Sequence, residues 1–98
     1  LMPKGYIIGH ITVKDPEAYK EYVEKDTPIL KGFGARFLVR GGPSETPEGA
    51  TQDRHVVIEF DSPAPGKPPS DDPDYQAVAE IRRASAESTI ILVEGHEE

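Results

Sequence analysis

The sequence has no cysteine, no tryptophan and a single methionine. Without cysteine the chain forms no disulfides and offers no thiolate chemistry, which fits a reducing compartment, so we expect the protein to act in the cytoplasm. No apolar run approaches the roughly 20 residues that are needed to cross a bilayer, and no charged-then-apolar leader is recognised. We therefore expect no membrane segment.

Basic residues are also scarce. The chain has 11 lysines and arginines against 18 aspartates and glutamates, which gives a formal net charge of −7. This charge repels phosphate backbones and anionic lipid, so we expect neither nucleic acid nor a membrane surface as a partner. The length of 98 residues allows one domain with a modest core, which we place at residues 2–95, followed by a short C-terminal tail at 96–98.

Four segments have the composition and alternation of β-strands, at residues 5–13, 35–40, 55–60 and 89–94. Because side chains alternate between the two faces of a strand, each segment divides into two sets. The apolar set, expected beneath helices, is Ile7, Ile11, Val13, Phe37, Val39, Val56, Ile58, Phe60, Ile91 and Val93. The mixed set includes the apolar residues Tyr6, Ile8, Leu38, Val57, Ile90 and Leu92.

Two helices are predicted, each opened by an aspartate followed by proline, at Asp15 and at Asp72. In the first helix Ala18, Tyr19, Tyr22 and Val23 repeat at helical spacing and are expected to face a sheet. Thr27-Pro28 is expected to bend or restart this helix. In the second, Tyr75, Val78, Ala79, Arg82 and Ala86 mark one face.

The resulting order of elements, β-α-β-β-α-β, predicts an α+β fold of the ferredoxin-like type. Its four-stranded antiparallel sheet carries both helices on one face. The other face is left uncovered, and its apolar residues are too many to leave in water. We therefore expect a second copy to pack against it, which makes the protein a homodimer.

Several longer stretches together resemble the bacterial family named domain of unknown function 1330, within the dimeric α/β-barrel superfamily. They are GYIIGHITVKDPEAYKEY at 5–22, GARFLVRGG at 34–42, HVVIEF at 55–60, DPDYQ at 72–76 with RR at 82–83, and ILVEG at 91–95. The resemblance implies two-fold barrel pairing and a small cavity between sheet and helices. It implies no established reaction, because the superfamily includes monooxygenases, isomerases and haem-binding members.

The chain departs from the family pattern after the third strand. Residues 61–69 contain four prolines, which a helix does not tolerate, so we expect a loop there. Any pocket wall that a helical turn supplies in relatives is therefore in question, and the role of the loop at 61–70 is not defined by the sequence.

Alternation places His10, Arg40, Glu59 and Glu94 together on the mixed face. The strands of His10 and Glu59 are neighbours in the predicted sheet, so Glu59 is a candidate to orient His10 as a general base. The alternative is that these groups pair with each other as a satisfied polar network inside the barrel.

Arg36 and Arg40 are candidate ligand-binding residues, because a guanidinium offers a planar fork of donors to a carboxylate or phosphate. Each arginine could instead pair with a nearby glutamate. Tyr19 and Tyr22 on the first helix and Tyr75 on the second are candidates to present hydroxyls to a pocket between helices and sheet, or they are ordinary core aromatics. Glu94 completes the candidate ligand-binding set. The three histidines lack the close spacing of a metal site, so no metal and no cofactor is expected.

Two functions follow from these observations. The first is a non-catalytic homodimer that binds a small metabolite in a cavity lined by the sheet. The second is a cofactor-free enzyme of the monooxygenase or isomerase type, with His10 as the base, Glu59 as its partner and Arg40 holding the substrate. Whether the protein is an enzyme is left open by the sequence.

Overall fold

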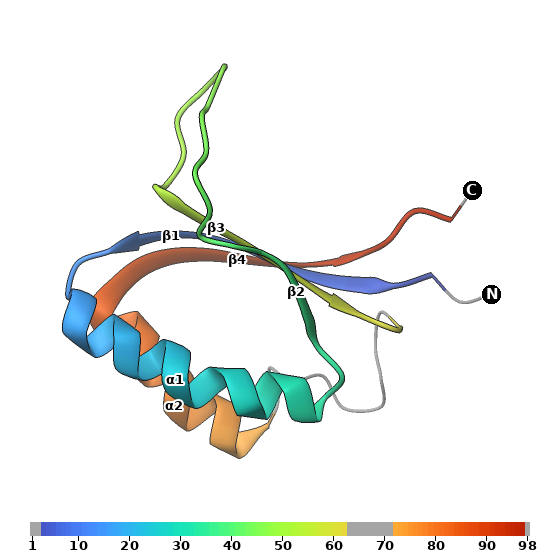
Figure 1. Ribbon diagram of the computed structural model, residues 1–98, viewed down its shortest axis with the longest axis horizontal. Coiled ribbons are helices and arrows are strands. Elements are labelled where there is room, and N and C mark those ends of the chain that lie inside the picture. The colour runs from blue at the N-terminus through green and yellow to red at the C-terminus, as the bar shows by residue number, and fades with distance from the viewer. Residues whose placement is uncertain (1–2, 63–71, 98) are drawn as a thin grey trace.

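The computed structural model describes residues 3–62 and 72–97. The elements are β1 (Gly5–Val13), α1 (Pro16–Gly32), β2 (Arg36–Arg40), β3 (Arg54–Phe60), α2 (Pro73–Ser85) and β4 (Ala86–Glu94). The strands form one antiparallel sheet in the order β2-β3-β1-β4. Both helices lie on one side of the sheet (Figure 1). The predicted fold class is therefore confirmed.

Both helices begin where the aspartate-proline pairs predict. The Asp15 carboxylate accepts a hydrogen bond from the backbone N–H of Ala18 at 3.2 Å, and Asp72 accepts one from the N–H of Tyr75 at 2.9 Å. These bonds satisfy backbone donors that the first helical turn leaves without partners. The N-terminal ends of both helices are thus fixed by short-range sequence signals.

Thr27-Pro28 was predicted to bend or restart the first helix. A restart is wrong, because α1 runs through Pro28 to Gly32. Proline removes one backbone donor from the helix. The Thr27 hydroxyl donates to the carbonyl of Val23 at 2.7 Å, which adds a local bond one residue before the proline. Helix α1 therefore presents one continuous buried line of Tyr19, Tyr22, Asp26 and Leu30.

Strand β4 begins at Ala86, directly after α2, rather than at Thr89 as predicted. Its register places Ile91 opposite Ile8 and Val93 opposite Tyr6 on β1, on the side away from the helices. The prediction that Ile91 and Val93 lie beneath the helices was therefore wrong. Ile90 and Leu92, which were predicted on the uncovered face, pair with Gly9 and Ile7 and are on the helix side of the sheet. Four successive apolar residues carry no alternation, so only the pairing with β1 decides their faces.

Strand β2 contains a bulge between Phe37 and Val39, where the register to β3 shifts by one residue. Phe37 pairs with Ile58 on the helix side as predicted, but Val39 pairs with Val57 on the other side. The predicted faces of Val39 and Arg40 were therefore exchanged. A bulge inserts one extra residue into a strand, so every side chain beyond it changes face relative to simple alternation.

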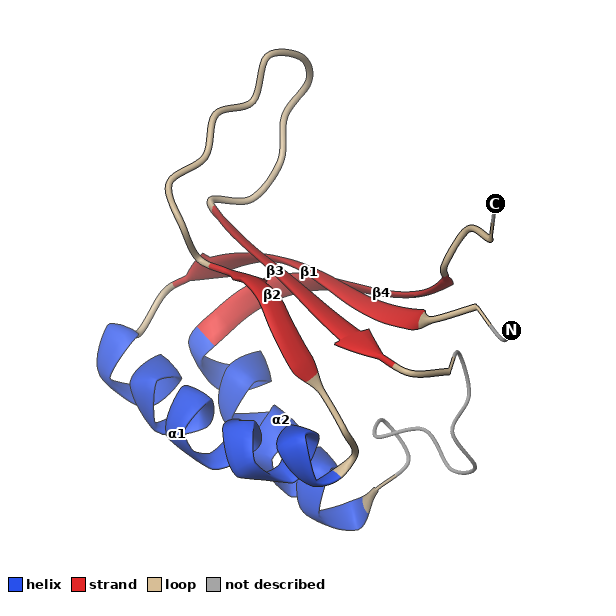
Figure 2. Cartoon of the chain, turned by 45° about the vertical axis from the view of Figure 1, so that its right-hand side comes forward, coloured by secondary structure: helices blue, strands red, loops and turns tan. Residues whose placement is uncertain are grey.

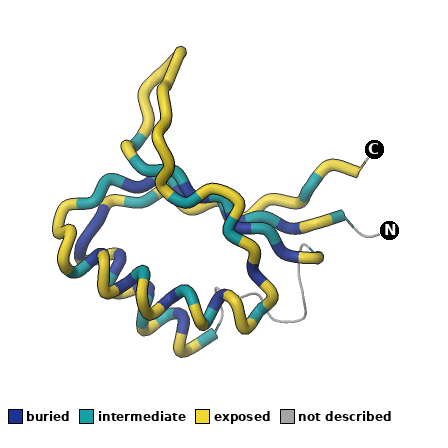
Figure 3. The backbone as a smooth tube through the Cα atoms, in the orientation of Figure 1, coloured by how far each residue is buried: buried dark blue, intermediate teal, exposed yellow. Residues whose placement is uncertain are grey.

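The hydrophobic core lies between the sheet and the helices, where buried residues of both layers meet (Figure 3). Ile7 and Ile11 of β1 and Val56, Ile58 and Phe60 of β3 form the sheet side of this core, as predicted. Leu30 of α1 and Ala79 of α2 are fully buried on the helix side. The faces predicted from side-chain alternation are thus confirmed for β1 and β3, the two central strands.

We call the side of the sheet away from the helices the open face. By register and alternation its apolar side chains are Tyr6, Ile8, Leu38, Val39, Val57, Ile91 and Val93. Leu38 is 54% exposed and Val93 44% exposed in the single chain. The open face therefore carries a large uncovered apolar surface.

The segment that joins β2 to β3, residues 41–53, rises from the sheet on the same side as the open face (Figures 1 and 2). Almost all of its residues are exposed. The predicted proline-rich loop at 61–70 lies largely outside the described residues. Among the described helices, none is long and apolar enough to cross a membrane.

Candidate functional site

A pocket opens between the sheet and the two helices. The space that the centre of a water-sized molecule can occupy there is about 30 Å³, and the empty volume is about 410 Å³ when the open solvent at the mouth is counted. Apolar side chains from β1, β3 and α1 form much of its wall, and Gly9 of β1 is part of its lining. The polar residues that line it are Tyr19, Tyr22, Asp26, Arg40, Arg54, Tyr75 and Arg82.

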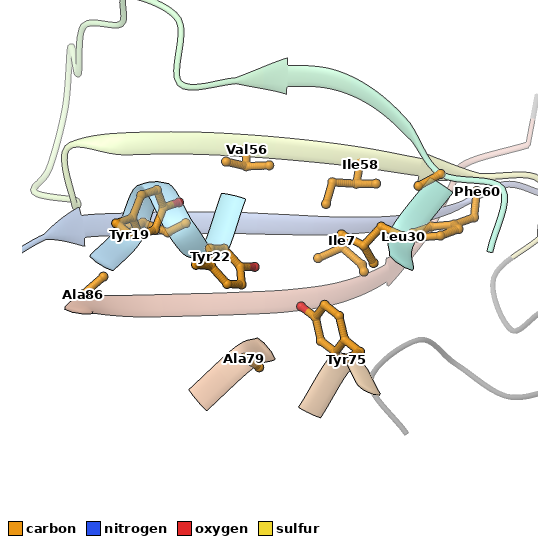
Figure 4. Packing of buried hydrophobic residues seen from close by; sticks show 12 residues of the cluster. Ile7, Tyr19, Tyr22, Leu30, Val56, Ile58, Phe60, Tyr75, Ala79 and Ala86 are labelled. Carbon is orange, nitrogen blue, oxygen red and sulfur yellow. The ribbon is translucent and has the colours of Figure 1, made fainter. Parts of the chain in front are cut away.

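Two tyrosines from different helices meet around one arginine inside this pocket. Figure 4 shows the hydroxyls of Tyr22, from α1, and Tyr75, from α2, pointing toward the same region. Nη1 of Arg82 lies 3.4 Å from the Tyr22 hydroxyl oxygen and 3.3 Å from that of Tyr75. Burial raises the pKa of the Tyr22 hydroxyl far above its ordinary range. Tyr22 therefore stays protonated, and its hydroxyl donates a hydrogen bond to Asp26.

Asp26 is the one carboxylate among the described residues that line the pocket, and it is only 3% exposed. Its Oδ1 lies 3.2 Å from Nη2 of Arg40, and the same nitrogen donates to the Thr27 hydroxyl at 2.8 Å. Desolvation raises the pKa of Asp26, against the opposing effect of hydrogen bonds from Tyr22, Thr27 and Arg40. Asp26, which is buried, and Arg40, which is partly exposed, thus form an ion pair that joins α1 to β2.

The β2 bulge is what brings Arg40 into this pocket. Simple alternation predicts that Arg40 shares the mixed face with His10, whereas the structure places its guanidinium 4.0 Å from the centre of the Phe37 ring. Phe37 and Arg40 therefore lie on the same side of the sheet. The predicted role of Arg40 in ligand binding stays a prediction, but it now concerns the pocket under the helices.

The structure does not bring His10 and Glu59 together. Nδ1 of His10 lies 2.9 Å from Nδ1 of His55, its direct cross-strand neighbour. Glu59 is four residues further along β3, where it accepts hydrogen bonds from the Tyr6 hydroxyl and from Nε of Arg36, both at 2.9 Å. The predicted pair is replaced by two separate groups on the open face, His10 with His55 and Glu59 with Tyr6 and Arg36.

The remaining candidates divide between the two sides of the sheet. Tyr19 and Tyr22 are buried and line the pocket, as the ligand-binding hypothesis requires. Arg36 is on the open face, where it joins Glu59 and also Asp61 at 2.8 Å. Glu94 is exposed at the end of β4, opposite Gly5. By register it is on the same side of the sheet as Ile7 and not with His10, so its predicted face was wrong. Among the described residues, no group of three or more histidines and carboxylates could hold a metal ion.

Tyr75 lines the pocket together with Tyr19 and Tyr22, as the sequence suggested. Sequence reasoning missed Asp26, Arg54 and Arg82 as members of the pocket. A signal for two of them was present: Asp26 follows Tyr22 by four residues, and Arg82 follows Ala79 by three, so each continues a buried helical line. A charged residue in a line of core positions indicates a buried charge with a special environment.

The pKa of Asp26 predicts how the stability of the protein changes with pH. In the folded chain the pKa of Asp26 is above its ordinary value near 3.8. At a pH between these two pKa values, Asp26 therefore binds more protons in the folded chain than in the unfolded chain. The stability of the protein therefore falls as pH rises through this window. We expect Asp26→Asn, which cannot ionise, to gain stability relative to the wild type as the pH is raised from about 4 to 7 in urea unfolding experiments.

Asp61→Asn is the matched control for this prediction. Hydrogen bonds from Arg36 hold the pKa of the Asp61 carboxyl below its ordinary value, so the sign is reversed. The wild type should gain stability relative to Asp61→Asn as the pH rises. A pH trend of the same sign for both variants would contradict the assignment of Asp26 as a carboxylate destabilised by burial.

Several solved structures share the fold of this chain. A protein of unknown function from Rhodopseudomonas palustris is similar with a TM-score of 0.78 at 17% identity, covering 100% of this chain and 86% of that one. SnoaB, a cofactor-independent oxygenase from Streptomyces nogalater, is similar with a TM-score of 0.65 at 13% identity, covering 98% and 96%. At these identities the likeness concerns the fold. No curated protein matches the chain at a significant level.

The predicted family resemblance is tested by a family model. This model, described as Domain of unknown function (DUF1330), matches residues 4–96, which is nearly the whole sequence and includes every element of the pocket. The chain therefore belongs to the DUF1330 family.

Proposed function

We propose that the protein is a homodimer that binds a small metabolite in the pocket between the sheet and the helices. The observation that carries this proposal is the pocket itself. It combines apolar walls from Ile7, Ile11 and Ile58 with several polar groups that converge on one region. This combination is typical of small-molecule sites, in which the apolar wall supplies affinity and a few polar groups supply orientation.

The open face supports the homodimer. Leu38, Val39, Ile91 and Val93 are each more than 40% exposed in the single chain, and they lie on one continuous side of the sheet. A second copy of the same face would bury them, as in a two-fold interface where one patch meets its own copy. Ion pairs at the two ends of β1, Lys14 with Glu87 and Lys4 with Asp61, supply the polar rim of such an interface.

Two measurements test the proposal. Sedimentation at micromolar concentration should give twice the chain mass of 10.7 kDa. Titration with a library of small metabolites, followed by amide NMR, should shift the amide resonances of residues in α1, in α2 and on the helix side of β1. A monomer would contradict the dimer, and shifts confined to the open face would contradict the pocket.

The lack of cysteine makes the cytoplasm the proposed compartment.

The second candidate is a cofactor-free enzyme with His10 as the base. The observation that favours it is the contact between His10 and His55, which requires one imidazole to donate and the other to accept. His55 then takes the orienting role that the sequence suggested for Glu59. The substrate in this case binds on the open face, so ligand shifts at β1 and β3 residues of that face distinguish it from the pocket proposal.

A further inference from the structure

Arg82 is a buried cation that pairs with no carboxylate among the described residues. It is 7% exposed, and no ion pair between described residues includes it. Within residues 3–62 and 72–97 its Nη1 reaches only the two tyrosine hydroxyls, at 3.3 and 3.4 Å, and its Nε is buried without a hydrogen-bond partner. A buried charge in this state is strongly unfavourable unless something else compensates it.

The other charges that line the pocket do not compensate Arg82. The single carboxylate there, Asp26, is engaged by Arg40. The third arginine, Arg54, lies over the Tyr19 ring at 5.4 Å and also has a buried Nε without a partner. The pocket is therefore positive, although the protein as a whole carries a net charge of −7.

We propose that the ligand of this pocket is a small organic acid whose carboxylate binds Arg82, with its apolar part against Ile7, Ile11 and Ile58. This inference rests on the proposed function of the pocket. A guanidinium matches a carboxylate through two parallel N–H bonds, and such charge-assisted bonds are among the strongest in proteins. The Tyr75 hydroxyl, which accepts from Arg82, has its own proton to donate to the second carboxylate oxygen.

A carboxylate fits the site better than a phosphate for two reasons. One negative charge balances the single deeply buried cation, since Arg40 already has its partner and Arg54 is less buried. A phosphate dianion would bring a second charge and more acceptor oxygens into a wall that is largely apolar. Arg54, nearer the solvent, adds attraction for an approaching anion.

The test compares matched ligands on the intact wild-type protein. Benzoate and hexanoate, and their uncharged amides benzamide and hexanamide, are titrated together with inorganic phosphate and followed by amide NMR. We expect the acids to bind and the amides to bind at least about tenfold more weakly, because a hydrogen bond to a charged group is involved. Equal binding of acid and amide would overturn the carboxylate assignment and leave the pocket function standing.

Two further outcomes are also decisive. Phosphate that binds more tightly than either acid would overturn the carboxylate in favour of another anion. No binding by any acid or amide, up to millimolar concentration, would overturn this inference, whereas the pocket function is tested separately by the metabolite library described above.

Variants at Arg82 separate ligand binding from a structural role. Arg82→Met keeps the length of the side chain and removes the charge, so we expect it to weaken benzoate binding by about tenfold to a hundredfold. Its denaturation midpoint without ligand should equal or exceed that of the wild type, because an uncompensated buried charge is lost. Arg82→Lys, which keeps the charge without the planar fork, should show intermediate binding.

The matched control is Arg83→Met. Arg83 is the next residue of α2, but it is exposed and pairs with Glu80 and Gln76 on the helix surface. Its replacement should leave benzoate binding unchanged. If Arg82→Met instead lowers the denaturation midpoint while acid binding is retained, Arg82 is a structural link between the tyrosines. That result would overturn the proposal.

Discussion

Replacement of Ile91 by glutamate is expected to convert the proposed dimer into monomers. Ile91 lies opposite Ile8 on the open face and is 41% exposed in the single chain. In a dimer formed through this face, each copy would bury one new carboxylate without a partner, at a cost of several kcal/mol. An increase of about a thousandfold in the dimer dissociation constant corresponds to only about 4 kcal/mol. Sedimentation velocity at micromolar concentration measures the change.

Two variants control for other effects of Ile91→Glu. Ala84→Glu adds the same charge to the exposed surface of α2 and should leave the dimer intact. Ile91→Thr keeps a β-branched side chain in the strand and should weaken the dimer less than glutamate does. A folded Ile91→Glu protein that still sediments as a dimer would show that the open face is not the interface.

Replacement of Leu30 by alanine is expected to produce the largest loss of stability of any single core change in α1. Leu30 is fully buried, at 0% exposed, where α1 meets the sheet. Truncation of a buried leucine costs roughly 2–5 kcal/mol, since both the buried apolar surface and the packing are lost. For a domain of this size the melting temperature should fall by on the order of 10–20 °C.

The comparison must be made at one protein concentration, because dimer formation contributes to the apparent stability. Lys20→Ala is the control: it changes an exposed residue of the same helix to the same alanine and should alter stability by less than about 0.5 kcal/mol. A loss below about 1 kcal/mol for Leu30→Ala would mean that the region around Leu30 collapses to fill the space.

The fold was predictable because local signals agree with one another. The aspartate caps at Asp15 and Asp72 define both helix starts, and alternation in β1 and β3 assigns Ile7 and Ile58 to the core as found. These signals depend on residues close in sequence. They hold wherever one face of an element is clearly apolar.

The faces of the two edge strands were not predictable in the same way. In β4 the run Ile90-Ile91-Leu92-Val93 is apolar on both sides, so its orientation depends on pairing with β1 rather than on its own pattern. In β2 the bulge after Phe37 leaves no recognisable mark in the sequence. Both errors come from long-range pairing that the local pattern does not encode.

The candidate site was predicted only in part. Tyr19, Tyr22 and Arg40 do meet in the pocket, but the reasoning placed Arg40 on the other side of the sheet. Arg82 was predicted to lie on one face of the second helix, but its role as a buried cation in the pocket was not predicted. That role depends on the distance between α1 and α2, which brings Tyr22 next to it, and periodicity within one helix contains no such distance.

The extra residue in β2 has a consequence for how this protein could diverge. Leu38 is the residue of β2 without a partner on β3, so its loss would leave Val39 opposite Val57 and Arg40 opposite Val56, each on its present face. Loss of the bulge with every residue retained would instead turn Val39 toward Asp26 and Arg40 onto the open face, without altering β1 or β3, since β2 is an edge strand with a single neighbour. Relatives whose β2 keeps this length but lacks the bulge would therefore differ in ligand preference and in self-association together.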